Sequence, residues 1–152
     1  MNGNVFSLCL CSYEPRFADA VAEAEQLCFA EPWSRRAVEE FFSYPHNGAV
    51  VALADGAFAG YAGYTHIADE FEIANVAVLP AFRRCGVAQE MLARLILTAR
   101  DLKAKRLTLE VRESGEAAKA LYAKVGFVAV GRRRAFYKHP TEDALLMDFV
   151  LE

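Results

Sequence analysis

The chain has 152 residues, of which 55% are hydrophobic and 24% are charged, and its formal net charge is -3 at pH 7. This balance is typical of one globular domain with a packed core and excludes a disordered or fibrous protein. The acidic net charge disfavours a general nucleic-acid-binding surface, and no stretch approaches the roughly 20 apolar residues that span a bilayer. We expect a single domain over residues 1–152 that is cytoplasmic, since residues 1–10 lack the basic start of a signal peptide.

The first half of the chain is predicted to form two helices followed by an antiparallel pair of strands. Apolar residues recur at helical spacing over residues 15–29, and Ser34 can cap a second, short helix. Strand-like runs at residues 49–54 and 58–66 are joined by Asp55 and Gly56, a dipeptide that favours the positive φ angles of a tight hairpin turn.

The second half alternates strands and helices. A strand at residues 71–79 precedes an amphipathic helix at residues 87–100. In the next strand, residues 107–112, apolar and polar residues alternate, so Glu110 lies on the face away from the core. A helix over residues 116–124 and strands over 127–130 and 144–151 complete a mixed sheet that is covered by helices.

The junction before the long helix contains Arg83-Arg84-Cys85-Gly86-Val87-Ala88. A glycine that opens a helix lets a phosphate reach the free backbone N–H groups, where the helix dipole favours negative charge. Taken alone, this segment is equally compatible with an ordinary helix-start glycine beside a solvated pair of arginines. The Gly-Lys-Ser/Thr ending of a nucleotide-hydrolysing P-loop is missing, which disfavours that activity.

Along the chain, a strand is followed by a proline, the segment Arg-Arg-x-Gly-x-Ala and an amphipathic helix. This order resembles the acetyl-CoA pyrophosphate loop of the GNAT superfamily of N-acetyltransferases, whose motif is Arg/Gln-x-x-Gly-x-Gly/Ala. The resemblance implies an α/β fold with a central mixed, mostly antiparallel sheet of about six to seven strands and about four helices. It also implies that acetyl-CoA is the acetyl donor. The expected acetyl-CoA contacts are Val76, Ala77 and Val78 along the pantetheine arm, and Arg83, Arg84, Cys85, Gly86, Val87, Ala88 and Gln89 around the pyrophosphate.

Acetyl transfer from a thioester to an amine needs an unprotonated amine and a proton for the departing thiolate. Glu110 can accept the first proton, directly or through water, and Tyr122 can donate the second. Both residues lie in a segment that resembles the RimI type within the superfamily, which implies the same two roles. The segment reads Leu-Glu-Val-Arg-Glu-Ser-Gly-Glu-Ala-Ala-Lys-Ala-Leu-Tyr. Gly115 stands where that type has an Asn that contacts acetyl-CoA, so one hydrogen bond worth about 1 kcal/mol is in question.

Three further segments resemble the RimI type, namely Cys28-Phe29-x-x-Pro32-Trp33-Ser34, Asn75-Val-Ala-Val78 and Tyr137-x-x-Pro140-x-Glu142-Asp143-Ala144. The resemblance implies a protein N-terminus as acceptor, with the N-terminal alanine of small-subunit ribosomal protein eighteen as the leading substrate. Trp33 and Tyr137 suit the walls of a groove that admits a peptide, although core packing is an equal alternative for Trp33.

Two charged clusters allow both a functional and a structural interpretation. The acidic trio Asp69, Glu70 and Glu72 can attract a basic peptide terminus or form a solvated edge, and Arg132-Arg133-Arg134 can touch an acidic substrate or protect a sheet edge. The four cysteines and three histidines lack ligand spacing, so we predict reduced thiols and no metal site.

Two alternatives remain open beside protein N-terminal acetylation. The first is a GNAT enzyme that acetylates a small-molecule amine with the same acetyl-CoA site. The second is a non-catalytic module that binds acyl-CoA without turnover. The sequence does not predict the oligomeric state.

Overall fold

A seven-stranded sheet forms the centre of the molecule in the computed structural model, which describes residues 6–151. The sheet order is β1-β2-β3-β4-β5-β7-β6, and β4 and β5 are parallel whereas the other neighbours are antiparallel. This arrangement confirms the predicted mixed, mostly antiparallel sheet. The strands are β1 (Leu8–Ser12), β2 (Asn47–Ala54), β3 (Ala57–Ile67), β4 (Glu70–Val78), β5 (Arg106–Arg112), β6 (Val128–Tyr137) and β7 (Glu142–Val150).

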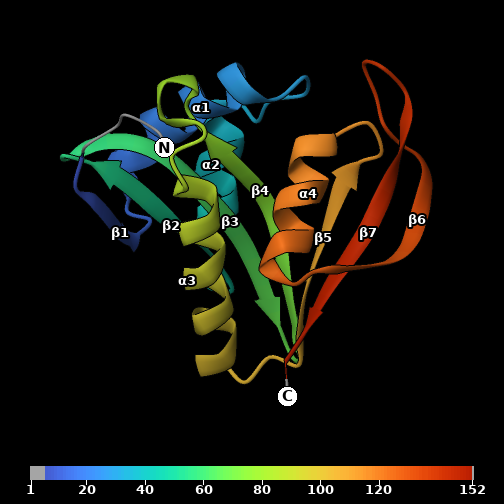
Figure 1. Cartoon of the computed structure of the whole chain (residues 1–152). Coiled ribbons are helices and arrows are strands. Elements are labelled where there is room, and N and C mark those ends of the chain that lie inside the picture. The colour runs from blue at the N-terminus through green and yellow to red at the C-terminus, as the bar shows by residue number, and fades with distance from the viewer. Residues whose placement is uncertain (1–5, 152) are drawn as a thin grey trace.

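Helices cover both faces of this sheet (Figure 1). The first face carries α1 (Ala18–Cys28) and α2 (Arg35–Phe42), and the second carries α3 (Val87–Asp101) and α4 (Glu116–Val125). Each pair of helices packs its apolar side chains against one face of the sheet. Because successive strand residues point to opposite faces, two separate hydrophobic cores result. In the part of the chain that the structure describes, the helices are too short or too polar to cross a membrane.

Local sequence signals explain several element boundaries. The Ser34 side chain accepts a hydrogen bond from the Ala37 backbone N–H at 3.0 Å, so it caps α2 as predicted. Asp55 and Gly56 have φ angles of +50° and +85°, which are the positive values that the β2–β3 hairpin requires.

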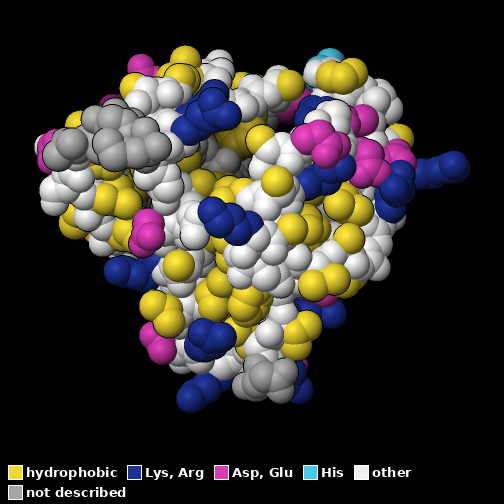
Figure 2. All heavy atoms as spheres, in the orientation of Figure 1, with side chains coloured by type: hydrophobic (Ala, Val, Ile, Leu, Met, Phe, Trp, Pro, Cys, Tyr) yellow, Lys and Arg dark blue, Asp and Glu magenta, His cyan; other side chains and the backbone are white. Residues whose placement is uncertain are grey.

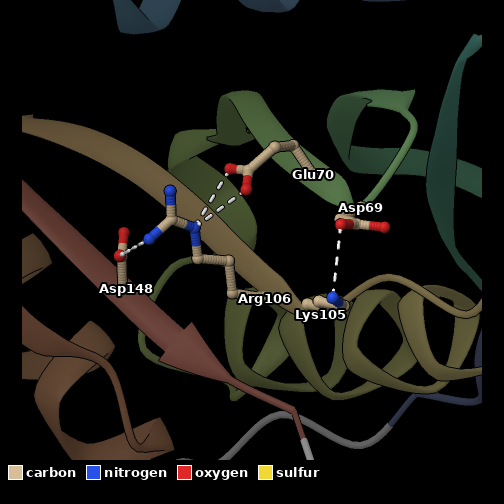
Figure 3. Close-up of polar contacts among 5 residues, drawn as sticks. All are labelled: Asp69, Glu70, Lys105, Arg106 and Asp148. Atoms are coloured by element: carbon tan, nitrogen blue, oxygen red, sulfur yellow. Dashed lines mark hydrogen bonds and ion pairs between the residues drawn. The ribbon is translucent and has the colours of Figure 1, made fainter.

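The sheet opens into a V between β4 and β5. These strands pair only over Glu70–Glu72 and Arg106–Thr108, and beyond that point they separate (Figure 1). Ion pairs close the narrow end: Arg106 contacts Glu70 at 3.0 Å and Asp148 at 3.4 Å, and Lys105 contacts Asp69 at 3.6 Å (Figure 3). Asp69 and Glu70 therefore hold strands together there, and the structure does not support a role for them in attracting a peptide.

Two features of the sheet differ from the sequence prediction. β1 was not predicted, and it forms one edge by pairing with β2. β6 is longer than the predicted strand at residues 127–130 and contains the arginine run, with register shifts against β7. Arg132 and Arg133 form ion pairs with Glu113 and Glu110, so these two arginines contact the chain's own carboxylates.

Candidate active site

Two adjoining cavities occupy the open end of the V. The first measures about 620 Å³ and lies between the end of β4, the loop before α3, and α4. Figure 2 shows the molecule hollowed in this region, with basic side chains beside the hollow. The basic side chains among the lining residues are Arg83, Arg84 and Lys124, which suits an anionic ligand.

The loop before α3 has the geometry of an anion site. Gly86 is the N-cap of α3 with a φ of +81°, and no atom lies within 4 Å of the position that a Cβ would take. The first N–H groups of a helix lack partners within the helix, so at this end of α3 they and the helix dipole favour a phosphate. Arg83 fixes the loop, because its Nε donates to the Val78 carbonyl at 3.0 Å.

The end of β4 offers backbone groups to a ligand in the first cavity. Because β5 has already diverged, the β5-facing edge of Val76, Ala77 and Val78 has no strand partner among residues 6–151, and all three line the cavity. An unpaired strand edge presents N–H and C=O groups in a row. An extended chain with amide groups, such as a pantetheine arm, fits such an edge.

The second cavity measures about 310 Å³ and contains Glu110 from β5. Its wall includes Asn75, Val76 and Tyr137, and it shares Cys28, Phe29, Val76, Ala118 and Tyr122 with the first cavity. Arg133 Nε donates to Glu110 Oε2 at 2.8 Å, whereas Oε1 accepts no hydrogen bond from the residues that the structure describes. One carboxylate oxygen of Glu110 is thus available to a bound molecule.

Tyr122 stands where the two cavities meet, since it lines both. Burial, together with the nearby Tyr137, raises the pKa of Tyr122 to about 12, so its hydroxyl stays protonated at neutral pH. Burial and the charge of Glu110 likewise raise the pKa of Tyr137 to about 12. The Arg112 guanidinium lies 4.6 Å from the centre of the Tyr137 ring and holds it in place.

Most of the predicted acetyl-CoA contacts gather around the first cavity, namely Val76, Ala77, Val78, Arg83, Arg84, Gly86, Val87, Ala88 and Gln89. Cys85 and Gly115 do not line it. The Cys85 thiol donates to the Arg83 carbonyl at 3.3 Å, and Gly115 starts α4 beside the second cavity. Trp33 lies outside the lining of both cavities and packs on Phe41, with ring centres 4.9 Å apart, so its position favours the core-packing alternative.

Sequence reasoning did not assign a role to three residues that the structure places at the cavities. Cys28 and Phe29 line both of them, and Asn75 lines the second. All three fall within the segments that resemble the RimI type, but the spacing alone gave no reason to place them at a cavity. Whether these side chains reach the cavities depends on where α1 ends relative to β4, and the sequence spacing does not give this long-range arrangement.

Comparison with known proteins identifies the family. Residues 18–127 match the acetyltransferase (GNAT) family. The N-alpha-acetyltransferase RimI of Mycobacterium tuberculosis is 35% identical over 136 residues, which cover 86% of this chain and 84% of that protein. The [ribosomal protein bS18]-alanine N-acetyltransferase of Escherichia coli K12 is 32% identical over 145 residues, which cover 90% and 93%.

Solved structures show the same fold. The crystal structure of the ribosomal-protein-S18-alanine N-acetyltransferase from Escherichia coli superposes with a TM-score of 0.90 and 29% identity, and covers 96% of this chain and 95% of that one. Members of the family take the acetyl group from acetyl-CoA, which agrees with the anion site and the unpaired strand edge of the first cavity. The chain belongs to the GNAT family and is an acetyl-CoA-dependent N-acetyltransferase.

Proposed function

We propose that this enzyme acetylates the N-terminal α-amine of a protein and that its substrate is the N-terminal alanine of small-subunit ribosomal protein eighteen. In this proposal Glu110 is the general base and Tyr122 is the general acid. The observation that carries the proposal is the joint position of Glu110 and Tyr122 on the second cavity, which adjoins the first cavity at Tyr122. The names of relatives that match over most of their length support the acceptor.

The chemistry of the amine favours an α-amine over a lysine. An α-amine has a pKa of about 7.7–8.0 and a lysine side chain about 10.4. The free-energy cost of deprotonation near neutral pH is therefore roughly 3–4 kcal/mol lower for an α-amine than for a lysine. A single carboxylate is a sufficient base for such an acceptor. Glu110 has one oxygen held by Arg133 and the other facing no protein donor among residues 6–151, which suits it to accept the proton.

In the proposed reaction the amine nitrogen bonds to the thioester carbonyl carbon and the carbon–sulfur bond breaks. The amine proton passes to Glu110, directly or through water, and the departing sulfur receives a proton from Tyr122. Because burial raises the pKa of Tyr122 to about 12, its hydroxyl holds its proton until negative charge develops on the sulfur. The water-poor surroundings of Tyr122 strengthen that interaction.

Turnover of a peptide with the N-terminus of ribosomal protein eighteen tests these roles. Glu110→Gln and Tyr122→Phe should each lower kcat by about 100-fold or more, with little change in acetyl-CoA affinity. Glu113→Gln and Tyr64→Phe are matched controls, since neither side chain lines the two cavities, and both should retain wild-type kcat. Unchanged rates in Glu110→Gln and Tyr122→Phe would refute the assignments.

A screen of acceptors tests the proposed substrate class. We expect the peptide to be acetylated and polyamines and other small amines to be poor acceptors. Turnover of a small amine with no turnover of the peptide would favour the small-molecule alternative. Binding of acetyl-CoA with no turnover of any amine would indicate a non-catalytic module.

A further inference from the structure

A buried carboxylate lies behind the second cavity. Glu25 of α1 is 0% exposed, and three donors from different parts of the fold reach it. The Trp33 backbone N–H donates to Oε1 at 2.9 Å, and Oε2 accepts from the Tyr61 hydroxyl and from Asn75 Nδ2, the latter at 2.8 Å. A fully buried carboxyl is costly unless its hydrogen bonds are satisfied, so this arrangement is a specific feature of the fold.

The partners of Glu25 are all neutral. Within residues 6–151, Glu25 takes part in no ion pair with Lys, Arg or His. Burial, together with the neighbouring Glu25 carboxyl that accepts its hydrogen bond, raises the pKa of Tyr61. A buried carboxyl group without a cationic partner therefore lies one side chain away from the cavity that we assign to the acceptor amine.

Asn75 links Glu25 to that cavity. Because a carboxylate only accepts hydrogen bonds, it selects the orientation in which the amide nitrogen of Asn75 faces Glu25 and the oxygen faces away. Oδ1 accepts no hydrogen bond from the described part of the chain. This oxygen is not fully buried, so solvent reaches it. Asn75 lines the second cavity, so a donor bound there can approach the Asn75 side chain.

We propose that Asn75 Oδ1 accepts a hydrogen bond from an N–H of the acceptor amine, and that Glu25 is the positioning residue that fixes the amide in this orientation. The inference rests on the proposed function, since it concerns the amine in the second cavity. Hydrogen bonds in a chain polarise one another, so the Glu25 carboxylate also makes Oδ1 a stronger acceptor. Asn75 lies on β4 and Glu110 on β5, so the two side chains approach the amine from opposite sides of the V.

Steady-state kinetics with the peptide acceptor and acetyl-CoA tests the inference. Asn75→Ala should raise the KM for the peptide about tenfold, because it removes one hydrogen bond to an amine, and should leave kcat and the KM for acetyl-CoA within about twofold. Glu25→Gln should raise the peptide KM by a similar factor, since a Gln amide can donate to Asn75 and reverse its orientation. The double variant should show no further loss, because both changes remove the same interaction.

Tyr61→Phe is the matched control. It removes another donor to the same oxygen of Glu25 but leaves Asn75 in place, so the peptide KM should stay within about twofold of wild type. An unchanged peptide KM in Asn75→Ala, an equal rise in the KM for acetyl-CoA, or additive losses in the double variant would overturn the inference. If Glu25→Gln does not fold, Asn75→Ala decides alone. If the wild type acetylates no α-amine, the proposed function itself fails.

Discussion

The loop before α3 allows a test of acetyl-CoA binding that separates backbone strain from ligand contact. Gly86 in the loop and Gly56 in the β2–β3 hairpin have φ angles of +81° and +85°, and an added Cβ at either position would meet no atom within 4 Å. The two glycines therefore share the same conformational demand and the same free space. Gly86 lines the first cavity, whereas Gly56 lies in a hairpin turn away from it.

The stability cost of an alanine should be similar at both positions. A left-handed conformation costs a non-glycine residue about 1–2 kcal/mol, and the lower entropy of the unfolded chain returns about 0.4–1 kcal/mol. The net loss is about 1 kcal/mol, which corresponds to a decrease in Tm of roughly 2–4 °C for a domain of this size. Gly86→Ala and Gly56→Ala should therefore unfold at nearly the same temperature.

Acetyl-CoA affinity should separate the two variants. If the pyrophosphate binds at this loop, the methyl group of Gly86→Ala would crowd it, so Kd should rise by about tenfold, or 1.4 kcal/mol. Gly56→Ala should bind acetyl-CoA like the wild type. Isothermal titration calorimetry and thermal unfolding measure both effects, and equal affinities in the two variants would refute the assignment of the pyrophosphate to this loop.

Three further predictions follow from the pKa values and from Gly115. The wild-type kcat/KM should rise as the α-amine deprotonates near pH 8 and show no decrease up to about pH 10, because the pKa of Tyr122 is raised to about 12; a decrease between about pH 9 and 10 would contradict this. Hydrogen bonds from Arg112 and Ser114 lower the pKa of Glu142. The ionised carboxylate therefore stabilises the fold at pH values above its ordinary pKa, and this stabilisation is lost as the pH falls through the lowered pKa. Glu142→Gln should therefore lower Tm at pH 7, and this loss should shrink as the pH falls below the ordinary pKa of 4.5; a loss that stays constant down to low pH would contradict the contact. Gly115→Asn should raise Tm by about 2 °C, because Gly115 caps α4 at a φ of -79° that Asn accepts readily; a lower Tm would show that the 3.2 Å approach of Cβ to the Arg112 carbonyl dominates.

Local features of the fold could be predicted from the sequence because they depend on neighbouring residues. The Ser34 cap and the Asp55-Gly56 turn follow from side-chain and backbone preferences within a few residues. The alternation in β5 likewise predicted that Glu110 points away from the apolar core, and the structure has Leu109 and Val111 buried on the opposite side.

Features that depend on distant partners could not be predicted in this way. β1 is a five-residue strand whose only sheet neighbour within residues 6–151 is β2, and β6 is exposed along nearly its whole length, so neither carries a clear apolar alternation. Glu25 shares the helical stripe of Val21 and Cys28, but its partners Tyr61 and Asn75 lie 36 and 50 residues away. An acidic residue on an apolar stripe was the one local signal of a buried carboxylate.

Mass spectrometry identifies directly which amine the enzyme acetylates. The protein is incubated with acetyl-CoA and a peptide that begins Ala-Arg, as in the proposed substrate, and the product is fragmented in a mass spectrometer. The proposed function predicts one acetyl group on the N-terminal α-amine, and none when Glu110→Gln replaces the wild type over the same time. An acetyl group on a lysine side chain alone, or an unmodified peptide beside an acetylated small amine, would contradict it.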